Sequence, residues 1–310
     1  MFGEWLIYAV ASIVCWGLIN VLDSYFVESK IYKNMFDGMI VSSLYKVWGV
    51  ALVGGIFFTK VLEISLINAL LAMLGGALIS MAFLSYFAAM LYNNDSPLVQ
   101  LAWNLSSPLV VVLGYVFLKE EFSIKAYVGM GIIFLGAFVI SFSKDSFKGK
   151  FSKLMLLLVP LVVLYSTSEV LMKYIEEVRN VEFEQSFPFL CLGQVLFGSI
   201  ILIIRRKSIE NIGKIIKKNW ALFFSSEALE LLGLFLMQLG IAKAPSISLF
   251  GVVEAFMPAM VILLTGVSIF LLKIFKRGDT LKKIYEENML SGIRAKIIAT
   301  AIMMVGVYLI

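Results

Sequence analysis

The chain is dominated by ten apolar runs, each about as long as a helix that crosses a bilayer. The runs cover residues 4–22, 36–58, 67–92, 96–117, 124–142, 154–174, 185–204, 220–242, 246–272 and 292–310. A spanning helix needs roughly 20 apolar residues. Because lipid cannot satisfy unpaired backbone groups, such runs fold as helices. We therefore expect an all-α polytopic membrane protein with ten transmembrane helices.

The composition agrees with a membrane location. Hydrophobic residues make up 61% of the chain and charged residues 15%, whereas soluble domains carry about 25% charged residues. The first run does not resemble a cleaved signal peptide, because Met1–Trp5 lacks a basic segment and the run continues past Trp16 and Asn20. We expect a multi-pass protein of a cell membrane, either plasma or bacterial inner membrane, with the lipid bilayer as a partner.

The residue inventory excludes several classes of function. There is no histidine, and the two cysteines, Cys15 and Cys191, lie inside apolar runs. This argues against a Cys/His zinc site, a His-based acid–base mechanism and a disulfide framework. The connections are too short for a soluble catalytic domain, so we expect no enzyme, no cofactor and no bound metal. The net charge of +5 is typical of orienting loop residues rather than of nucleic-acid binding.

The second half of the chain repeats the first. A shift of 149 residues lays Trp16–Val21 over Tyr165–Val170, and a shift of 150 lays Pro108 over Pro258. Five spans per half is an odd number, so the second copy must enter the membrane in the opposite sense. The sequence therefore predicts two inverted five-helix repeats.

These repeats define the expected organisation of the chain. The first repeat covers 1–142, a lysine-rich linker covers 143–153, and the second repeat covers 154–310. The second copy carries an insertion at about 273–290, which we expect to be an amphipathic helix on the membrane surface.

Two polar breaks occupy corresponding places in the two halves. Asn104 precedes Pro108 by four residues, and Glu254 precedes Pro258 by four. Because proline has no N–H to donate, we expect the carbonyls of Asn104 and Glu254 to lack their helical donor. Such breaks near the membrane midplane are typical of transporter binding sites.

A group of short motifs resembles one transporter family. The motifs are Trp16-Gly17, Ser96-Pro97, Ser107-Pro108, Phe117–Glu121, Gly129, Gly136, Ala244-Pro245 and Pro258. Together with ten spans and the duplication, they resemble EamA-type transporters of the drug/metabolite transporter superfamily. The resemblance implies a ten-helix basket with a central cavity and alternating access. It implies no particular substrate.

The acidic residues inside the spans are the strongest candidates for function. A charge at a helix centre costs about 2.5–3.5 kcal/mol on insertion scales, so such residues should face a wet cavity or be paired. Glu169 could pair with Lys173 one turn along. Glu227 and Glu230 share a helix face and repel, which suits a proton carrier unless Lys46 neutralises them.

A substrate site is predicted where aromatic and polar residues recur in both halves. Aromatic faces together with carboxylates are how proteins hold organic cations. The predicted substrate-binding residues are Trp16, Asn20, Gln100, Trp103, Asn104, Tyr165, Glu169 and Glu254, and the predicted proton-coupling residues are Glu227, Glu230 and Glu254.

These patterns lead to one functional hypothesis and two alternatives. We expect a secondary transporter of a small cationic or zwitterionic metabolite, such as an amine, a choline-like compound or an amino acid. We expect it to be proton-coupled and to act as a monomer or homodimer. Replacing Glu254 or Glu230 by glutamine should abolish pH-driven transport in a folded protein. The alternatives are a transporter or flippase of an anionic or lipid-linked sugar, which needs Lys46 and Lys173 in the cavity, and a divalent-cation carrier.

The orientation has two competing predictions. Loops 23–35, 143–153, 205–219 and 273–291 hold most of the lysines and arginines. The positive-inside rule places these loops in the cytoplasm and both termini outside. The family resemblance implies both termini inside.

Overall fold

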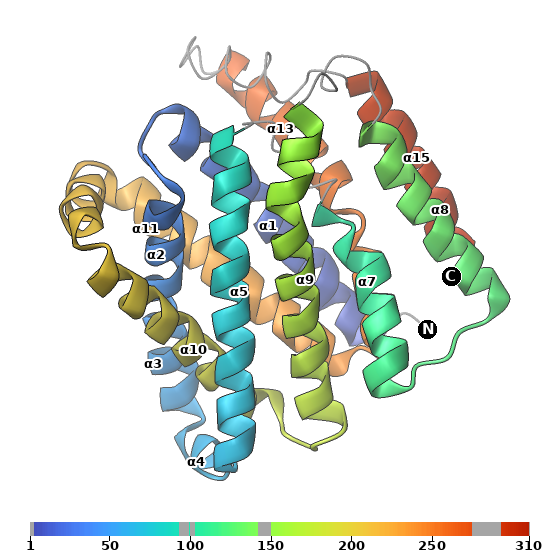
Figure 1. Ribbon diagram of the computed structural model, residues 1–310, viewed down its shortest axis with the longest axis horizontal. Coiled ribbons are helices and arrows are strands. Elements are labelled where there is room, and N and C mark those ends of the chain that lie inside the picture. The colour runs from blue at the N-terminus through green and yellow to red at the C-terminus, as the bar shows by residue number, and fades with distance from the viewer. Residues whose placement is uncertain (1–2, 93–98, 100–102, 142–149, 275–292, 310) are drawn as a thin grey trace.

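The computed structural model describes residues 3–92, 99, 103–141, 150–274 and 293–309, and all regular secondary structure in these residues is helical (Figure 1). The helices are α1 (Glu4–Glu28), α2 (Met35–Tyr45), α3 (Val47–Ile56), α4 (Phe58–Leu62), α5 (Leu66–Tyr92), α7 (Ser106–Leu113), the π-helix η1 (Gly114–Leu118), α8 (Ile124–Ser141), α9 (Lys150–Glu177), α10 (Phe183–Ile204), α11 (Arg206–Lys243), α12 (Ile247–Glu254), α13 (Met257–Ile274) and α15 (Ile293–Leu309).

Seven helical stretches in the described residues are long and apolar enough to cross a membrane. They are Glu4–Glu28, Met35–Ile56, Leu66–Tyr92, Leu156–Glu177, Phe183–Ile204, Trp220–Lys243 and Ile247–Ser268. Large apolar side chains such as Ile56 and Leu66 are exposed on their outer surface, as expected where lipid replaces water. The all-α, multi-pass architecture follows from these helices. Three further apolar helices, Ser106–Leu118, Ile124–Ile133 and Ile297–Gly306, are shorter than a full span.

Two expected elements differ from the structure. The run 36–58 matches the candidate span Met35–Ile56, but its helix is interrupted at Lys46 and ends at Ile56, and the short helix α4 follows from Phe58. The expected loop 205–219 is helical and forms the first third of α11. That segment contains no proline and only one glycine, Gly213, so its many Ile and Lys residues can continue the helix into the following span.

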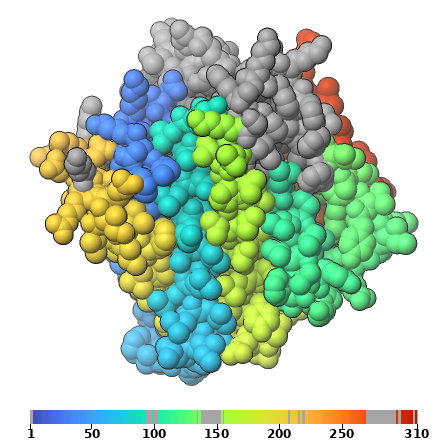
Figure 2. Space-filling view, viewed as in Figure 1, coloured from blue at the N-terminus to red at the C-terminus, as the bar shows by residue number. Residues whose placement is uncertain are grey.

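The helices pack in a few dominant pairs. α1 packs along α11, α5 along α9, and α8 along α15, while α10 packs against α2, α3 and α5. The α8–α15 pair stands at one side of the molecule in Figure 1. On the face drawn in Figure 2, α5 and α9 lie next to each other over most of their length.

The contact between α5 and α10 depends on glycine. A Cβ atom on Gly76 would lie 1.9 Å from the carbonyl oxygen of Leu190, and a Cβ on Gly193 would lie 2.0 Å from that of Met73. Each distance is far below any real contact, so neither position accepts a side chain at this spacing. Small residues that allow close backbone approach are a common means of packing helices in membranes.

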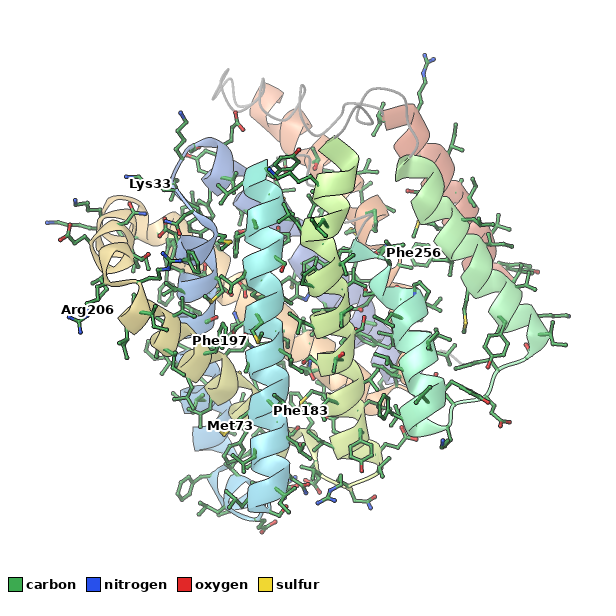
Figure 3. All side chains as sticks on the ribbon, in the orientation of Figure 1. Lys33, Met73, Phe183, Phe197, Arg206 and Phe256 are labelled. Atoms are coloured by element: carbon green, nitrogen blue, oxygen red, sulfur yellow. The ribbon has the colours of Figure 1, made fainter. Side chains whose placement is uncertain are left out.

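Two labelled residues mark the two ends of the molecule. Lys33, before α2, and Phe183, at the start of α10, lie toward opposite ends in Figure 3. We call these the Lys33 end and the Phe183 end. At the Phe183 end, Lys60 pairs with Glu182 at 2.6 Å.

Part of the expected organisation lies outside the described residues. This applies to Gln100, to residues 143–149 of the linker, and to residues 275–290 of the insertion.

Candidate functional site

The two polar breaks meet at the packing contact between α7 and α12. The Asn104 side chain donates from Nδ2 to the carbonyl oxygen of Ala255 at 2.7 Å. One turn away, the Ser107 hydroxyl donates to the carbonyl oxygen of Gly251 at 2.9 Å. Polar side chains of the first half therefore satisfy backbone acceptors at the break of the second half.

The prolines begin new helices rather than leaving gaps within continuous ones. Pro108 is the third residue of α7 and Pro258 the second of α13, positions where a backbone N–H has no intrahelical partner in any case. The expectation that Asn104 has an unpaired carbonyl is wrong, because the chain turns there and the carbonyl accepts from the Ser107 N–H at 3.2 Å.

A small cavity lies beside these breaks. It is lined by Trp16, Asn20, Trp103, Asn104, Ser106, Tyr165, Glu254 and Met257. The centre of a water molecule can move through about 20 Å³ of it, which is about the space of one water. Six of the predicted substrate-binding residues thus surround one space, brought together from four helical segments.

Glu254 is held at this cavity by an aromatic neighbour. The Tyr165 hydroxyl lies 3.3 Å from Oε1 of Glu254 and 2.9 Å from Sδ of Met237, with both as acceptors. The ring of Tyr165 packs edge-on against Trp103, with centroids 4.9 Å apart. The cavity therefore combines a carboxylate with aromatic walls.

Glu169 lies behind this pair without a cation. It is 1% exposed, and its carboxyl interacts with Glu254 and Tyr165. The geometry of these two contacts does not meet the criteria for a hydrogen bond. Neither carboxyl oxygen of Glu169 therefore has a hydrogen-bond partner in the described part of the chain. Glu169 does not line the cavity itself, but it contributes a second buried carboxyl to its surroundings.

The ion pair considered for Glu169 and Lys173 does not form. Lys173 instead pairs with Glu177 at 3.5 Å. Its ammonium also donates to the carbonyl oxygens of Ala244 at 2.6 Å and Ile241 at 3.2 Å. These carbonyls end α11, where the helix dipole favours a cation.

A second small cavity shares a wall with the first. Trp16, Asn20 and Trp103 line both spaces. The second cavity is also lined by Ile19, Asp23, Phe83, Tyr86, Phe87 and Glu230. The two adjacent spaces therefore extend from the break region to Asp23 of α1 and Glu230 of α11.

Tyr86 forms the polar contact between these regions. Its hydroxyl lies 2.8 Å from Oδ1 of Asn20 and 3.0 Å from Oδ2 of Asp23. The ring packs edge-on against Trp103 at 5.4 Å. Neither Tyr86 nor Asp23 was among the site residues predicted from the sequence. Tyr86 and Asp23 are 63 residues apart, and no local pattern links them.

The Glu227/Glu230 pair is partly neutralised by Lys46. The Lys46 ammonium lies 2.6 Å from Oε1 of Glu230, and the Ser42 hydroxyl donates to the same oxygen. This is the structural role that the sequence left open for Lys46. Glu227 interacts with Tyr32, but its Oε2 has no hydrogen-bond partner among the described residues.

The charge around the two cavities is acidic. Neither Lys46 nor Lys173 is among the described residues that line them. No three Asp, Glu, Cys or His side chains of the described residues gather as a metal site.

Comparison with known proteins identifies the fold and nothing more specific. No family model matches the chain, and no curated protein matches it. Among solved structures, one described only as "Crystal structure of protein" matches 100% of this chain and 96% of its own length, with a TM-score of 0.67 and 16% sequence identity. The arrangement of helices is therefore one that has been observed before.

Proposed function

We propose that this chain is a secondary transporter that moves a small cationic or zwitterionic metabolite across a cell membrane by alternating access. The observation that carries the proposal is the cavity at the meeting point of two broken helices. Glu254 and aromatic rings line it, and none of its described lining residues is basic. An amine, a choline-like compound or an amino acid has the matching chemistry.

The walls of this cavity suit an organic cation. Trp16, Trp103 and Tyr165 supply aromatic faces, which attract ammonium groups. Glu254 and the nearby Glu169 supply negative charge. The buried indole Nε1 of Trp16 has no hydrogen-bond partner in the part of the chain that the structure describes. Unsatisfied buried polar groups are costly, and a polar ligand would relieve that cost.

The helix packing supports an inverted repeat of two five-helix halves. If α1 corresponds to α9 and α5 to α11, then the α1–α11 and α5–α9 contacts are equivalent. The α8–α15 and α2–α10 contacts each join a helix to its own counterpart, and the α7–α12 contact joins the two broken spans. This reciprocity is expected of two copies related by a two-fold axis in the membrane plane. It also fits the motif resemblance to EamA-type drug/metabolite transporters.

The small size of the cavity is consistent with a closed stage of a transport cycle. Space for about one water is too small for any amine metabolite. Binding therefore requires the helices around the breaks to separate, as alternating access demands.

Proton coupling is the energy source that the buried carboxyls support best. Asp23, Glu169, Glu227, Glu230 and Glu254 are all less than 10% exposed. Of these, only Glu230 forms an ion pair with a described residue. The other carboxyls need protons or a bound cation to be tolerated within a bilayer.

Transport into proteoliposomes tests the proposal. With an imposed pH gradient, the wild-type protein should accumulate an organic cation or zwitterion from a panel of labelled amines, amino acids and nucleotide sugars. Glu254→Gln should lose gradient-driven accumulation, because it removes the carboxylate at the cavity. Transport of a nucleotide sugar instead, or equal gradient-driven uptake by Glu254→Gln, would overturn the proposed substrate class or mechanism.

A further inference from the structure

The acidic cluster at the second cavity contains more negative than positive groups. Asp23, Glu227 and Glu230 supply three carboxyls, whereas Lys46 supplies one ammonium, and all four residues are less than 10% exposed. Fully ionised, the cluster would carry two uncompensated negative charges inside a bilayer, which is costly. At least part of it must therefore hold exchangeable protons or a cation.

The structure distinguishes Glu230 from Asp23 within this cluster. Glu230 receives both the Lys46 ammonium and the Ser42 hydroxyl, so its negative charge is compensated. Asp23 forms no ion pair with any described residue, and its hydrogen bond comes from the neutral Tyr86 hydroxyl. Protonation of Asp23 therefore removes a buried negative charge that no described cation compensates, whereas the charge of Glu230 is already compensated.

Tyr86 connects Asp23 to the proposed substrate cavity. Its hydroxyl carries a single proton, which faces Oδ1 of Asn20 at 2.8 Å and Oδ2 of Asp23 at 3.0 Å. Asn20 lines both cavities. An ionised Asp23 is the stronger acceptor and draws the Tyr86 proton to itself. A protonated Asp23 can donate to the Tyr86 oxygen, which directs the Tyr86 proton to Asn20.

We propose that Asp23 is the exchangeable proton site of this protein and that Tyr86 is the positioning residue that makes its protonation compete with cation binding at Asn20. The coupling step rests on the proposed transport function. When a cation binds, Asp23 releases its proton to water, and the Tyr86 hydroxyl turns from Asn20 to the Asp23 carboxylate. One proton leaves as one cation arrives, so the exchange preserves charge and corresponds to antiport.

Several other groups face Asp23 and contribute to its titration. They are Tyr32 before α2, Lys46 after α2, Tyr86 on α5, and Glu227 and Glu230 on α11. A test must therefore separate the Asp23–Tyr86–Asn20 contact from the rest of the cluster.

Infrared difference spectroscopy across a pH titration of the purified protein tests the proton site without any substrate. The wild type should show a protonated-carboxyl band that Asp23→Asn lacks. Asn20→Ala should move the midpoint of this band to lower pH, because Tyr86 then donates only to Asp23. Tyr86→Phe should move it to higher pH, because the carboxylate loses its donor. Tyr25→Phe, a half-buried tyrosine elsewhere on α1, should leave the band unchanged.

An unchanged band in Asp23→Asn, or midpoint shifts of the same sign in Asn20→Ala and Tyr86→Phe, would overturn the assignment. These results do not depend on the substrate, so they remain decisive if the proposed transport function fails.

Proton release on binding then tests the coupling, with choline as the probe. At a pH where Asp23 is protonated, wild-type protein in weakly buffered detergent should release about one proton per bound choline, and by reciprocal linkage its choline affinity should rise with pH. Asp23→Asn should bind choline with almost no release, and Tyr86→Phe should bind it with a shallower pH dependence. Equal release from the wild type and Asp23→Asn would contradict the coupling. Failure of the wild type to bind choline would count against the proposed substrate class, while the infrared result would still decide the role of Asp23.

Discussion

At the residue scale, the buried pair of Lys46 and Glu230 has a direct consequence for mutagenesis. Their side chains are 0% and 8% exposed and lie 2.6 Å apart. Removing one partner of a buried pair leaves a buried charge and costs about 3–5 kcal/mol, whereas replacing both by apolar residues is often neutral or stabilising. The sequence-based expectation that Glu230→Gln leaves the fold intact therefore needs revision.

We expect Lys46→Met and Glu230→Leu each to lower the melting temperature in detergent strongly, and the double variant to recover most of the loss. The exposed pair Lys60–Glu182, with side chains 43% and 59% exposed, is the matched control and should show little change in any combination. If the loss of stability in the double variant equals the sum of the losses in the two single variants, the two residues do not act as a coupled pair.

At this scale, the sequence indicated which residues belong to the site more reliably than it indicated which residues they contact. The aromatic and polar positions Trp16, Asn20, Trp103 and Tyr165 were selected from the repeat, and the structure brings them to one cavity. The sequence suggested Glu169 as the partner of Lys173, but Glu177 also lies one turn from it and forms the ion pair. Two carbonyl oxygens at the end of α11 accept from the Lys173 ammonium and hold it on the side of Glu177.

At the element scale, helix breaks and glycine contacts set the architecture. Around the turns before Pro108 and Pro258, the side chains of Asn104 and Ser107 donate to the backbone carbonyls of Ala255 and Gly251. Gly76 and Gly193 allow α5 and α10 to cross closely. The two prolines were recognised in the sequence as helix breaks, whereas the packing role of Gly193 was not predicted. The atoms that they meet, such as the carbonyl oxygen of Met73, depend on the tertiary fold.

Gly193→Ala should destabilise the protein by about 1–3 kcal/mol, since overpacking costs that much and the facing atom is backbone that cannot rotate away. Gly55→Ala is the matched control, because a Cβ there meets nothing within 4 Å. It should leave stability unchanged or raise it by about 0.5–1 kcal/mol. Thermal unfolding in detergent measures both. Equal melting temperatures for the two variants would show that α5 and α10 do not cross this closely.

The limits of prediction at this scale have physical causes. Apolar runs identified where the helices lie, because membrane helices need long apolar stretches. They did not show the interruption at Lys46, whose ammonium contacts Glu230, a residue 184 positions away in the sequence. They also did not show that α11 extends back to Arg206, because a basic amphipathic helix and a basic loop have similar compositions.

At the scale of the whole molecule, the two ends should face opposite sides of the membrane. Lys33 and Glu63 are both exposed and lie in connections at opposite ends. The charge bias predicts that Lys33 faces the cytoplasm. A membrane-impermeant maleimide applied to intact cells should therefore label Glu63→Cys and not Lys33→Cys. The native Cys15 and Cys191 are buried, so background labelling should be low. The reverse pattern would support the orientation that the family resemblance implies.

The central claim is that the cavity between the broken helices binds an organic cation through Glu254. The most direct measurement is the melting temperature of purified wild-type and Glu254→Gln protein against amines, amino acids and nucleotide sugars, because a ligand that binds the native state raises its apparent stability. We predict that an amine or amino acid stabilises the wild type, by about 2.7 kcal/mol at 100 times its dissociation constant, and that Glu254→Gln loses this shift. Stabilisation by a nucleotide sugar alone, or equal stabilisation of both proteins by the same amine, would contradict the account.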